Sequence, residues 1–191
     1  MQKFFPVILF FLCVTATWSQ KKETEPVRFN PTVKKLEETV TVETDKKFYV
    51  GKVENACKDS TIGFTRTGLR TRSPLMSDPS PELVTENSLV NVFNNKKILT
   101  SDPSKANYMV EVKVLKYKLK EDSKFLHQVM SSVVAIEVKV TDPYDTTKVH
   151  QFKVESKGER TAFDTTKHAG SVMRQALQGV IGEILKSIDK L

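Results

Sequence analysis

The feature of this chain that most constrains its fold is an amphipathic pattern near the C-terminus, which predicts a long helix over residues 164–190. Its apolar residues recur three and four positions apart, the spacing that gathers side chains on one face of a helix. They are Ala169, Val172, Met173, Ala176, Leu177, Val180, Ile181, Ile184, Leu185 and Ile188. Asp164 and Thr165 are candidate N-caps, because their side-chain oxygens can accept hydrogen bonds from the first helical turn. So wide an apolar face needs a partner surface, which the preceding stretches can supply.

Alternating apolar residues predict three long β-strands before this helix, over residues 107–119, 129–141 and 148–156. Every second side chain is apolar over most of each stretch, as in a strand with one buried face. The alternation shifts by one residue near Val114 and Leu115, which predicts a β-bulge there. Short connections between consecutive strands predict antiparallel pairing.

Two shorter strands and one helix are predicted in the first half of the chain. Residues 47–54 and 61–67 are expected to pair as a hairpin, followed by a loop up to residue 80. A helix is expected over residues 81–97, with Ser80 as its N-cap and Pro81 at its first position. The order ββ-α-βββ-α predicts an α+β fold, a two-layer sandwich in which a mostly antiparallel sheet carries two helices on one face.

Residues 1–19 have the pattern of a secretory signal peptide. Lys3 precedes an apolar run over residues 4–14, and the small residues that follow allow cleavage after Ser19. The run is shorter than the roughly 20 residues that a membrane-spanning helix needs, and we expect no membrane span in the remaining chain. Residues 20–46 are polar and charged, so we expect a flexible N-terminal arm. Residues 47–191 are then expected to form a single domain.

Cysteine content and charge bear on the compartment. Removal of residues 1–19 takes away Cys13 and leaves Cys57, so no internal disulfide is expected. The chain also lacks an Asn-x-Ser/Thr glycosylation sequon. Both observations favour a bacterial periplasm over an animal extracellular space. With Lys3 removed, 29 basic residues face 23 acidic ones, so the exported chain keeps a net charge of +6.

The chain shows no residue pattern typical of a catalytic or metal-binding set. Its histidines lack the spacing of a metal site, and several of its aspartates precede prolines, as is common in turns. Cys57 has no cysteine partner and no base marked near it, which favours a packing role over a reactive thiol. The histidines are His127, His150 and His168, and the aspartates are Asp78, Asp102 and Asp142. We therefore expect no enzyme activity, cofactor or metal.

Arginine is concentrated in one segment, where Arg66, Arg70 and Arg72 account for three of the six arginines in the chain. The guanidinium fork binds phosphate and carboxylate groups in a bidentate manner. An anionic lipid surface or an acidic partner in an envelope protein complex is one interpretation, and a solvated basic hairpin is the other. Nucleic acid is not expected, because Phe64 is the only aromatic residue nearby.

Gly179 and Gly182 lie inside the predicted C-terminal helix, where each glycine costs about 1 kcal/mol relative to alanine. Small residues let another backbone approach a helix closely. The two interpretations are tight packing on the sheet of this chain and docking of a partner helix.

The second half of the chain resembles a group of bacterial envelope proteins. The residues that carry the resemblance are Ala106-Asn107-Tyr108-Met109-Val110-Glu111-Val112 and the turn Asp145-Thr146-Thr147-Lys148-Val149, followed by the terminal helix. The similar families are the ABC-type transport auxiliary lipoproteins, the YajG-like lipoproteins and relatives of the lipopolysaccharide-assembly lipoprotein, and the resemblance covers about residues 47–190. It implies a non-enzymatic accessory role beside a transporter or an outer-membrane complex.

One departure from these families concerns the lipid anchor. They usually carry a lipobox cysteine, whereas Cys13 lies inside the apolar run and follows Leu12, where a small residue is expected. We therefore expect a periplasmic or secreted protein without a lipid, peripheral to the outer membrane if it is membrane-associated.

The preferred function is an accessory or binding protein of a transport or envelope-assembly system. The alternative is a hydrolase of envelope material that uses Asp142, Asp145 or His150.

Overall fold

The computed structural model describes residues 24–38, 40–57, 61–66, 72–123, 128–162 and 166–191, so the expected signal peptide lies outside the described residues. The elements are β1 (Val27–Phe29), β2 (Phe48–Asn55), β3 (Gly63–Arg66), β4 (Arg72–Ser77), α1 (Pro81–Asn95), the 3-10 turn η1 (Pro103–Lys105), β5 (Tyr108–Ser123), β6 (Gln128–Thr141), β7 (Val149–Ala162), the 3-10 turn η2 (Thr166–His168) and α2 (Ala169–Ile188). Within these ranges, no helix is long and apolar enough to cross a membrane.

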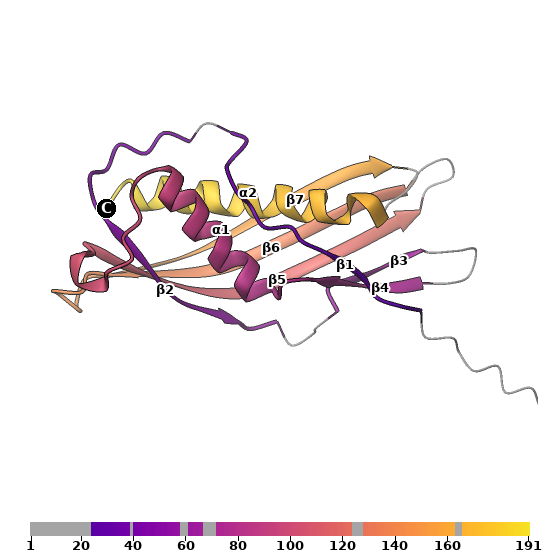
Figure 1. Cartoon of the computed structure of the whole chain (residues 1–191), viewed down its shortest axis with the longest axis horizontal. Coiled ribbons are helices and arrows are strands. Elements are labelled where there is room, and N and C mark those ends of the chain that lie inside the picture. Colours follow the sequence, from indigo (N-terminus) through magenta and orange to yellow (C-terminus); the bar gives the residue numbers. More distant parts are fainter. Residues whose placement is uncertain (1–23, 39, 58–60, 67–71, 124–127, 163–165) are drawn as a thin grey trace, which may run out of the picture.

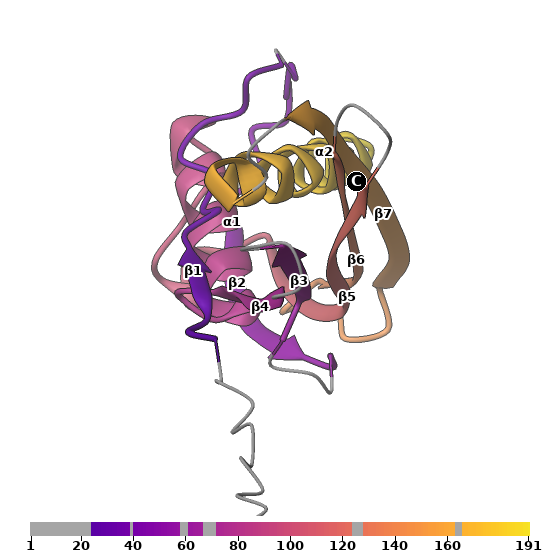
Figure 2. The same cartoon turned by 90° about the vertical axis from the view of Figure 1, so that its right-hand side faces the viewer.

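The strands form two mixed sheets, and the predicted α+β sandwich is confirmed. One sheet has the strand order β2-β5-β6-β7 and the other β1-β4-β3. The pairs β5–β6 and β6–β7 are antiparallel, as expected from their short connections. The larger sheet coils around α2, while α1 packs on β2 (Figures 1 and 2). The predicted bulge is also confirmed, because the β5–β6 register shifts between Val114 and Lys116.

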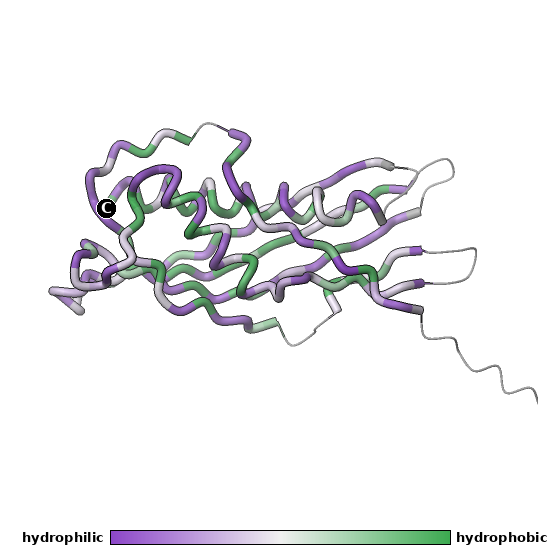
Figure 3. Tube along the Cα trace, in the orientation of Figure 1, coloured by the Kyte–Doolittle hydropathy of each residue, from purple (hydrophilic) through white to green (hydrophobic). Residues whose placement is uncertain are grey.

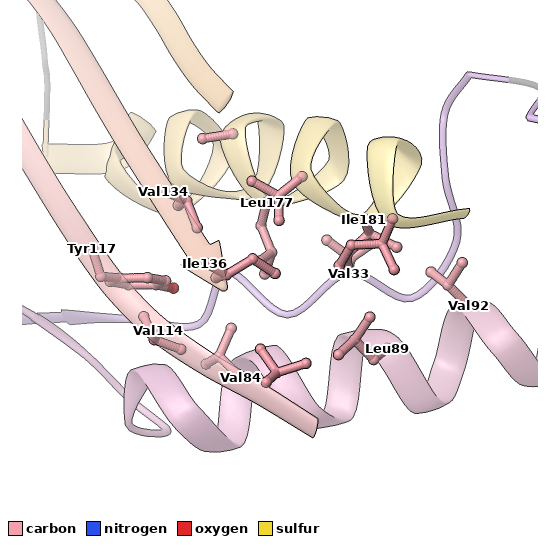
Figure 4. Close-up of a cluster of buried hydrophobic side chains, with 14 of the residues drawn as sticks. Val33, Val84, Leu89, Val92, Val114, Tyr117, Val134, Ile136, Leu177 and Ile181 are labelled. Carbon is pink, nitrogen blue, oxygen red and sulfur yellow. The ribbon is translucent and has the colours of Figure 1, made fainter. Parts of the chain in front are cut away.

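The core lies between α2, α1 and the inner face of the larger sheet. All ten residues of the predicted apolar face of α2 are buried. Leu177 and Ile181 point from α2 into the space between the sheet and α1, where they meet Val84 and Leu89 (Figure 4). Hydrophilic and hydrophobic residues alternate along the long strands, so their outer face is polar (Figure 3). The helix begins later than expected, with His168 at the N-cap position, and the candidate caps Asp164 and Thr165 lie outside the described residues.

The prediction that the first two strands pair as a hairpin is wrong. Instead, β2 pairs in parallel with β5, where Phe48 lies opposite Tyr108. β3 pairs with β4, a strand that lies in the stretch expected to be a loop. Phe48 is fully buried, stacks on Tyr108 at 5.6 Å between ring centroids and meets Phe93 edge-on at 6.0 Å. Burial of this aromatic cluster favours the long-range parallel pairing over a local hairpin.

The expected flexible arm is also corrected, because the described part of residues 20–46 packs on the domain. β1 pairs in parallel with β4. Val33 is fully buried, and its backbone N–H donates to the Ser88 hydroxyl of α1 over 2.9 Å. Further along, the Asp189 carboxylate accepts from the backbone N–H groups of Glu43 and Thr44. A polar segment is thus fixed by a few apolar anchors and by bonds to its backbone, which composition alone does not reveal.

Candidate functional site

The structure brings together two of the three clustered arginines at the end of the β3–β4 hairpin. Arg66 and Arg72 are direct partners across the antiparallel pair, and both are exposed. Arg70 lies outside the described residues. Like charges directly opposite one another on a sheet are destabilising, so a bound anion would relieve the repulsion between the two guanidinium groups. The pair therefore has the charge and the geometry of a small anion-binding surface.

The hairpin is held in place by the second half of β5. The backbone N–H of Leu119 donates to the carbonyl oxygen of Ile62 over 2.7 Å. Gly63 is required at this contact, because a Cβ there would overlap the carbonyl oxygen of Leu119. The Glu121 carboxylate accepts from the Thr65 hydroxyl at 2.7 Å and from the Arg66 backbone N–H at 3.1 Å. These bonds fix the backbone that presents Arg66.

A hollow of about 410 Å³ lies between the hairpin and β5, and both arginines line it. Phe64, which is 53% exposed, lines it as well. Lys120 adds a third cation and pairs with Asp122 at 2.9 Å. The site thus combines guanidinium groups, an exposed aromatic ring and neighbouring carboxylates. The lining thus places three cationic side chains around one hollow, with the Thr65–Glu121 bond at its base holding the hairpin to β5.

The described N-terminal segment enters the fold beside this site. The Thr24 hydroxyl donates to the backbone carbonyl oxygen of Arg72 over 2.7 Å. β1 follows at once and lies against β4 (Figure 1). Close by, Arg28 pairs with Asp78 at 3.7 Å on the surface. The point at which the chain enters the domain is therefore next to the arginine pair, which the sequence pattern did not indicate.

Gly179 and Gly182 have different surroundings on α2. Gly179 lies against Ser156 of β7, where a Cβ would overlap the serine hydroxyl, so tight packing on the sheet explains this glycine. Gly182 is buried, and the nearest atom to a Cβ there is Cγ2 of Val40 at 3.7 Å, an ordinary contact. A groove of about 260 Å³ beside both glycines is lined by Gln178, Lys157 and the segment around Glu38. Docking of a partner helix at these glycines stays a prediction.

The residues named for the hydrolase alternative belong to the β6–β7 turn and its flank. The Asp142 carboxylate accepts from the Tyr144 backbone N–H at 2.9 Å. The Asp145 carboxylate accepts from the Thr147 hydroxyl and backbone N–H and pairs with Lys148 at 3.2 Å. These bonds, led by that of the Thr147 hydroxyl, hold the pKa of Asp145 below its usual value. His150 is exposed on β7. The two acids therefore shape the turn.

The remaining candidates are spread over the fold. Among the described residues, no three of the His, Cys, Asp and Glu side chains are arranged to hold a metal ion. Cys57 is half-buried, with Sγ 3.8 Å from the carbonyl oxygen of Val114. The sequence did not single out Tyr117, whose side chain is buried in the core. Burial raises the pKa of Tyr117 well above its usual value, so the hydroxyl stays protonated.

Comparison with known proteins places the fold. No protein-family model and no curated protein matches the chain. Among solved structures, it is similar to protein XCC0632 from Xanthomonas campestris, of the DUF330 family, with a TM-score of 0.60 at 14% identity over 85% of this chain and 95% of that one. Weaker similarities include the hypothetical protein CT253 from Chlamydia trachomatis (TM-score 0.46, 12% identity, 76% and 96% covered) and a minor lipoprotein from Acinetobacter baumannii (0.39, 11%, 77% and 95%). The chain thus has the fold of a bacterial protein of the DUF330 family.

Proposed function

We propose that this protein is an exported, non-enzymatic accessory or binding protein of a bacterial envelope system for transport or assembly. Its working surface in this proposal is the end of the β3–β4 hairpin, which contacts an anionic membrane surface. The resemblance of residues 47–190 to envelope lipoproteins supports the compartment. The observation that carries the binding surface is the position of Arg66 directly opposite Arg72, since both side chains are exposed and line the same hollow.

The geometry explains why this end suits a lipid surface. Arg66 and Arg72 project together from a hairpin that Glu121 and Leu119 anchor to the domain. Phe64 is more than half exposed on the same hairpin and can enter the headgroup region. Basic residues close to an anionic membrane contribute about 1 kcal/mol each, and the attraction falls off within a Debye length of about 8 Å at physiological salt. Two adjacent arginines therefore give weak, salt-sensitive binding.

The test is flotation of the protein with phosphatidylcholine vesicles that contain or lack phosphatidylglycerol, at low and moderate salt. We expect binding only to the anionic vesicles, weakening as salt rises. The double variant Arg66→Ser/Arg72→Ser should bind roughly 30-fold more weakly, because it loses about 2 kcal/mol of attraction.

A matched control removes two positive charges from the opposite end of the molecule. Lys105→Ser/Lys148→Ser changes the net charge equally, at loops that meet where the Tyr144 hydroxyl donates to the carbonyl oxygen of Ser104. The 14 residues of β6 separate the two ends by roughly 40 Å. Equal losses in both double variants would show that net charge alone drives binding. Equal binding by the arginine variant and the unmodified protein would remove the hairpin from the proposal.

A further inference from the structure

The strand β7 exposes one edge of the larger sheet. It is the last strand in the order β2-β5-β6-β7, and no strand in the described part of the chain pairs with its outer edge. The backbone N–H of Glu159 donates to the Gln175 side chain over 3.2 Å, so this N–H points away from β6. Backbone groups alternate in direction along a strand. The N–H and C=O groups of Lys153, Glu155 and Lys157 therefore also point outward.

Charge alternates along the face of β7 that is turned away from α2. Gln151, Lys153, Glu155, Lys157 and Glu159 are all exposed there. Exposed strand edges often carry charges that prevent pairing with another chain. A row of lysines is effective because two edges of the same charge repel each other. The edge of β7 carries positive and negative side chains at alternate positions. In some registers, a second copy would therefore place opposite charges next to each other.

We propose that two copies of this chain pair in antiparallel fashion along their β7 edges, around a two-fold axis at Ser156. In this register Lys153 lies opposite Glu159 of the second copy, and Glu155 lies opposite Lys157. Symmetry repeats each pair, so all four charged side chains of each strand face an opposite charge, which stabilises cross-strand pairs. The outward N–H and C=O groups of the odd-numbered residues then face one another, as an antiparallel ladder requires. On pairing, the Glu159 N–H donates to the backbone of the second copy in place of the Gln175 side chain.

Neighbouring registers are less favourable, and this gives the pairing its specificity. An axis through Glu155 would place Lys153 opposite Lys157, and an axis through Lys157 would place Glu155 opposite Glu159. Like charges directly opposite one another destabilise a sheet. Moving the axis to Val154 or Gly158 keeps only one kind of opposite-charge pair. The charge sequence of β7 therefore favours one register.

Small residues lie on the other face of the strand at the proposed axis. Ser156 and Gly158 of β7 pack against α2, and the half-exposed Gly179 lies over Ser156. Gly179 is therefore accounted for by its own sheet, and Gly182 is covered by Val40 of the same chain. The proposed pairing rests on the edge of β7 and not on these two glycines.

The antiparallel arrangement has a consequence for the proposed membrane contact. The two β3–β4 hairpins would lie at opposite ends of the pair, because each sits at the end of the sheet where β5 meets β6 near Glu121. A dimer would then present its arginine pairs in opposite directions and contact two anionic surfaces. The pairing itself does not depend on membrane binding and is tested separately.

The test is sedimentation of the purified protein over a concentration series, with charge reversals in β7. We expect a monomer–dimer equilibrium. Lys157→Glu places two glutamates opposite each other at two symmetry-related positions and should raise the dissociation constant by roughly tenfold or more. Glu155→Lys/Lys157→Glu restores opposite charges and should restore dimerisation. Lys116→Glu makes the same charge change on β5, opposite Ala135 and away from the edge of β7. It should leave the dissociation constant of the dimer unchanged.

Amide hydrogen exchange gives a second readout that needs no variant. The amides of Lys153, Glu155 and Lys157 should exchange more slowly as concentration rises, while those of Val154 and Ser156, already bonded to β6, should change little. A monomer at every concentration, or a double reversal that fails to restore dimerisation, would overturn the proposal. Dimerisation without concentration-dependent protection of these amides would place the interface elsewhere and overturn it as well.

Discussion

Gly158 of β7 lies directly against the carbonyl group of Val172 on α2, with no room for a side chain between them. A Cβ on Gly158 would overlap the Val172 carbonyl oxygen and would lie 2.9 Å from the Ser132 hydroxyl, which itself donates to that carbonyl over 2.8 Å. We expect Gly158→Ala to lower the free energy of unfolding by about 1–3 kcal/mol, the usual cost of overpacking. Urea denaturation followed by circular dichroism measures the change.

Gly51→Ala is the matched control for this substitution. Gly51 lies in β2, where the nearest atom to a Cβ would be the Val110 carbonyl oxygen at 3.6 Å, an ordinary contact. We expect a neutral or slightly stabilising effect, since alanine loses less backbone freedom on folding. Similar destabilisation by both substitutions would mean that close approach of α2 to β7 is not the cause.

Leu177 tests the central role of α2 in the core. Its side chain is fully buried among residues of α1 and β6 (Figure 4). Truncation to alanine removes apolar contacts and leaves a cavity, so we expect Leu177→Ala to cost about 2–5 kcal/mol in the free energy of unfolding. Leu83→Ala on α1 is the control, because Leu83 is 48% exposed and should cost far less. An unchanged denaturation midpoint for Leu177→Ala would refute this packing of α2.

Ser88 tests the attachment of the N-terminal segment. Its buried hydroxyl accepts from the Val33 backbone N–H and donates to the carbonyl oxygen of Val84. Ser88→Ala would leave the Val33 N–H buried without a partner, which costs about 1–3 kcal/mol. Ser187→Ala removes only a helical bond to the carbonyl oxygen of Glu183 and should be nearly neutral. If thermal or urea unfolding shows equal effects for both variants, the Val33 anchor contributes nothing measurable.

The export prediction concerns residues outside the described structure. Mature protein purified from its native host should begin at Gln20, because the small residues before Ser19 fit signal-peptidase cleavage. It should carry no lipid, because Leu12 occupies the position where a lipobox needs a small residue. Intact-mass measurement decides both points. Retention of residues 1–19, or a diacylglyceryl group on Cys13, would contradict the prediction.

The sequence predicted most reliably the elements whose periodicity matches their burial. The apolar face of α2, the strands β5 and β6 and the bulge near Val114 follow from alternation along a single stretch. β7 was expected to end near residue 156, but it continues to Ala162. The polar residues in that continuation gave no apolar alternation to follow, because this part of the strand is held by pairing to β6.

The misses depend on contacts between distant parts of the chain. The parallel pairing of β2 with β5 requires the Phe48–Tyr108 contact, which no local pattern encodes. The attachment of the N-terminal segment depends on single anchors such as Val33. The arginine cluster was visible in the sequence, but its place beside Thr24 was not, because that contact joins residues 48 positions apart. Periodicity reports the burial of a face and does not report which surface covers it.

Asp145 provides a test of the β6–β7 turn through pH. The pKa of Asp145 is held below its usual value, first by the Thr147 hydroxyl and then by Lys148 and the Thr147 backbone N–H. A carboxylate whose pKa is lower in the folded state stabilises that state above its unfolded pKa, and the contribution is lost as pH falls through the folded pKa. The bonds of the turn should therefore persist at mildly acidic pH and weaken only when Asp145 becomes protonated.

The measurement is an NMR titration of the Thr147 amide, whose N–H donates to the Asp145 carboxylate at 3.2 Å. Its chemical shift should change with a midpoint below that of an aspartate in an unstructured peptide. Asp145→Asn keeps an oxygen acceptor but has no titrating proton, so it should abolish this transition while the turn remains. A midpoint at or above the usual aspartate value would show that these bonds do not favour the charged carboxylate in solution.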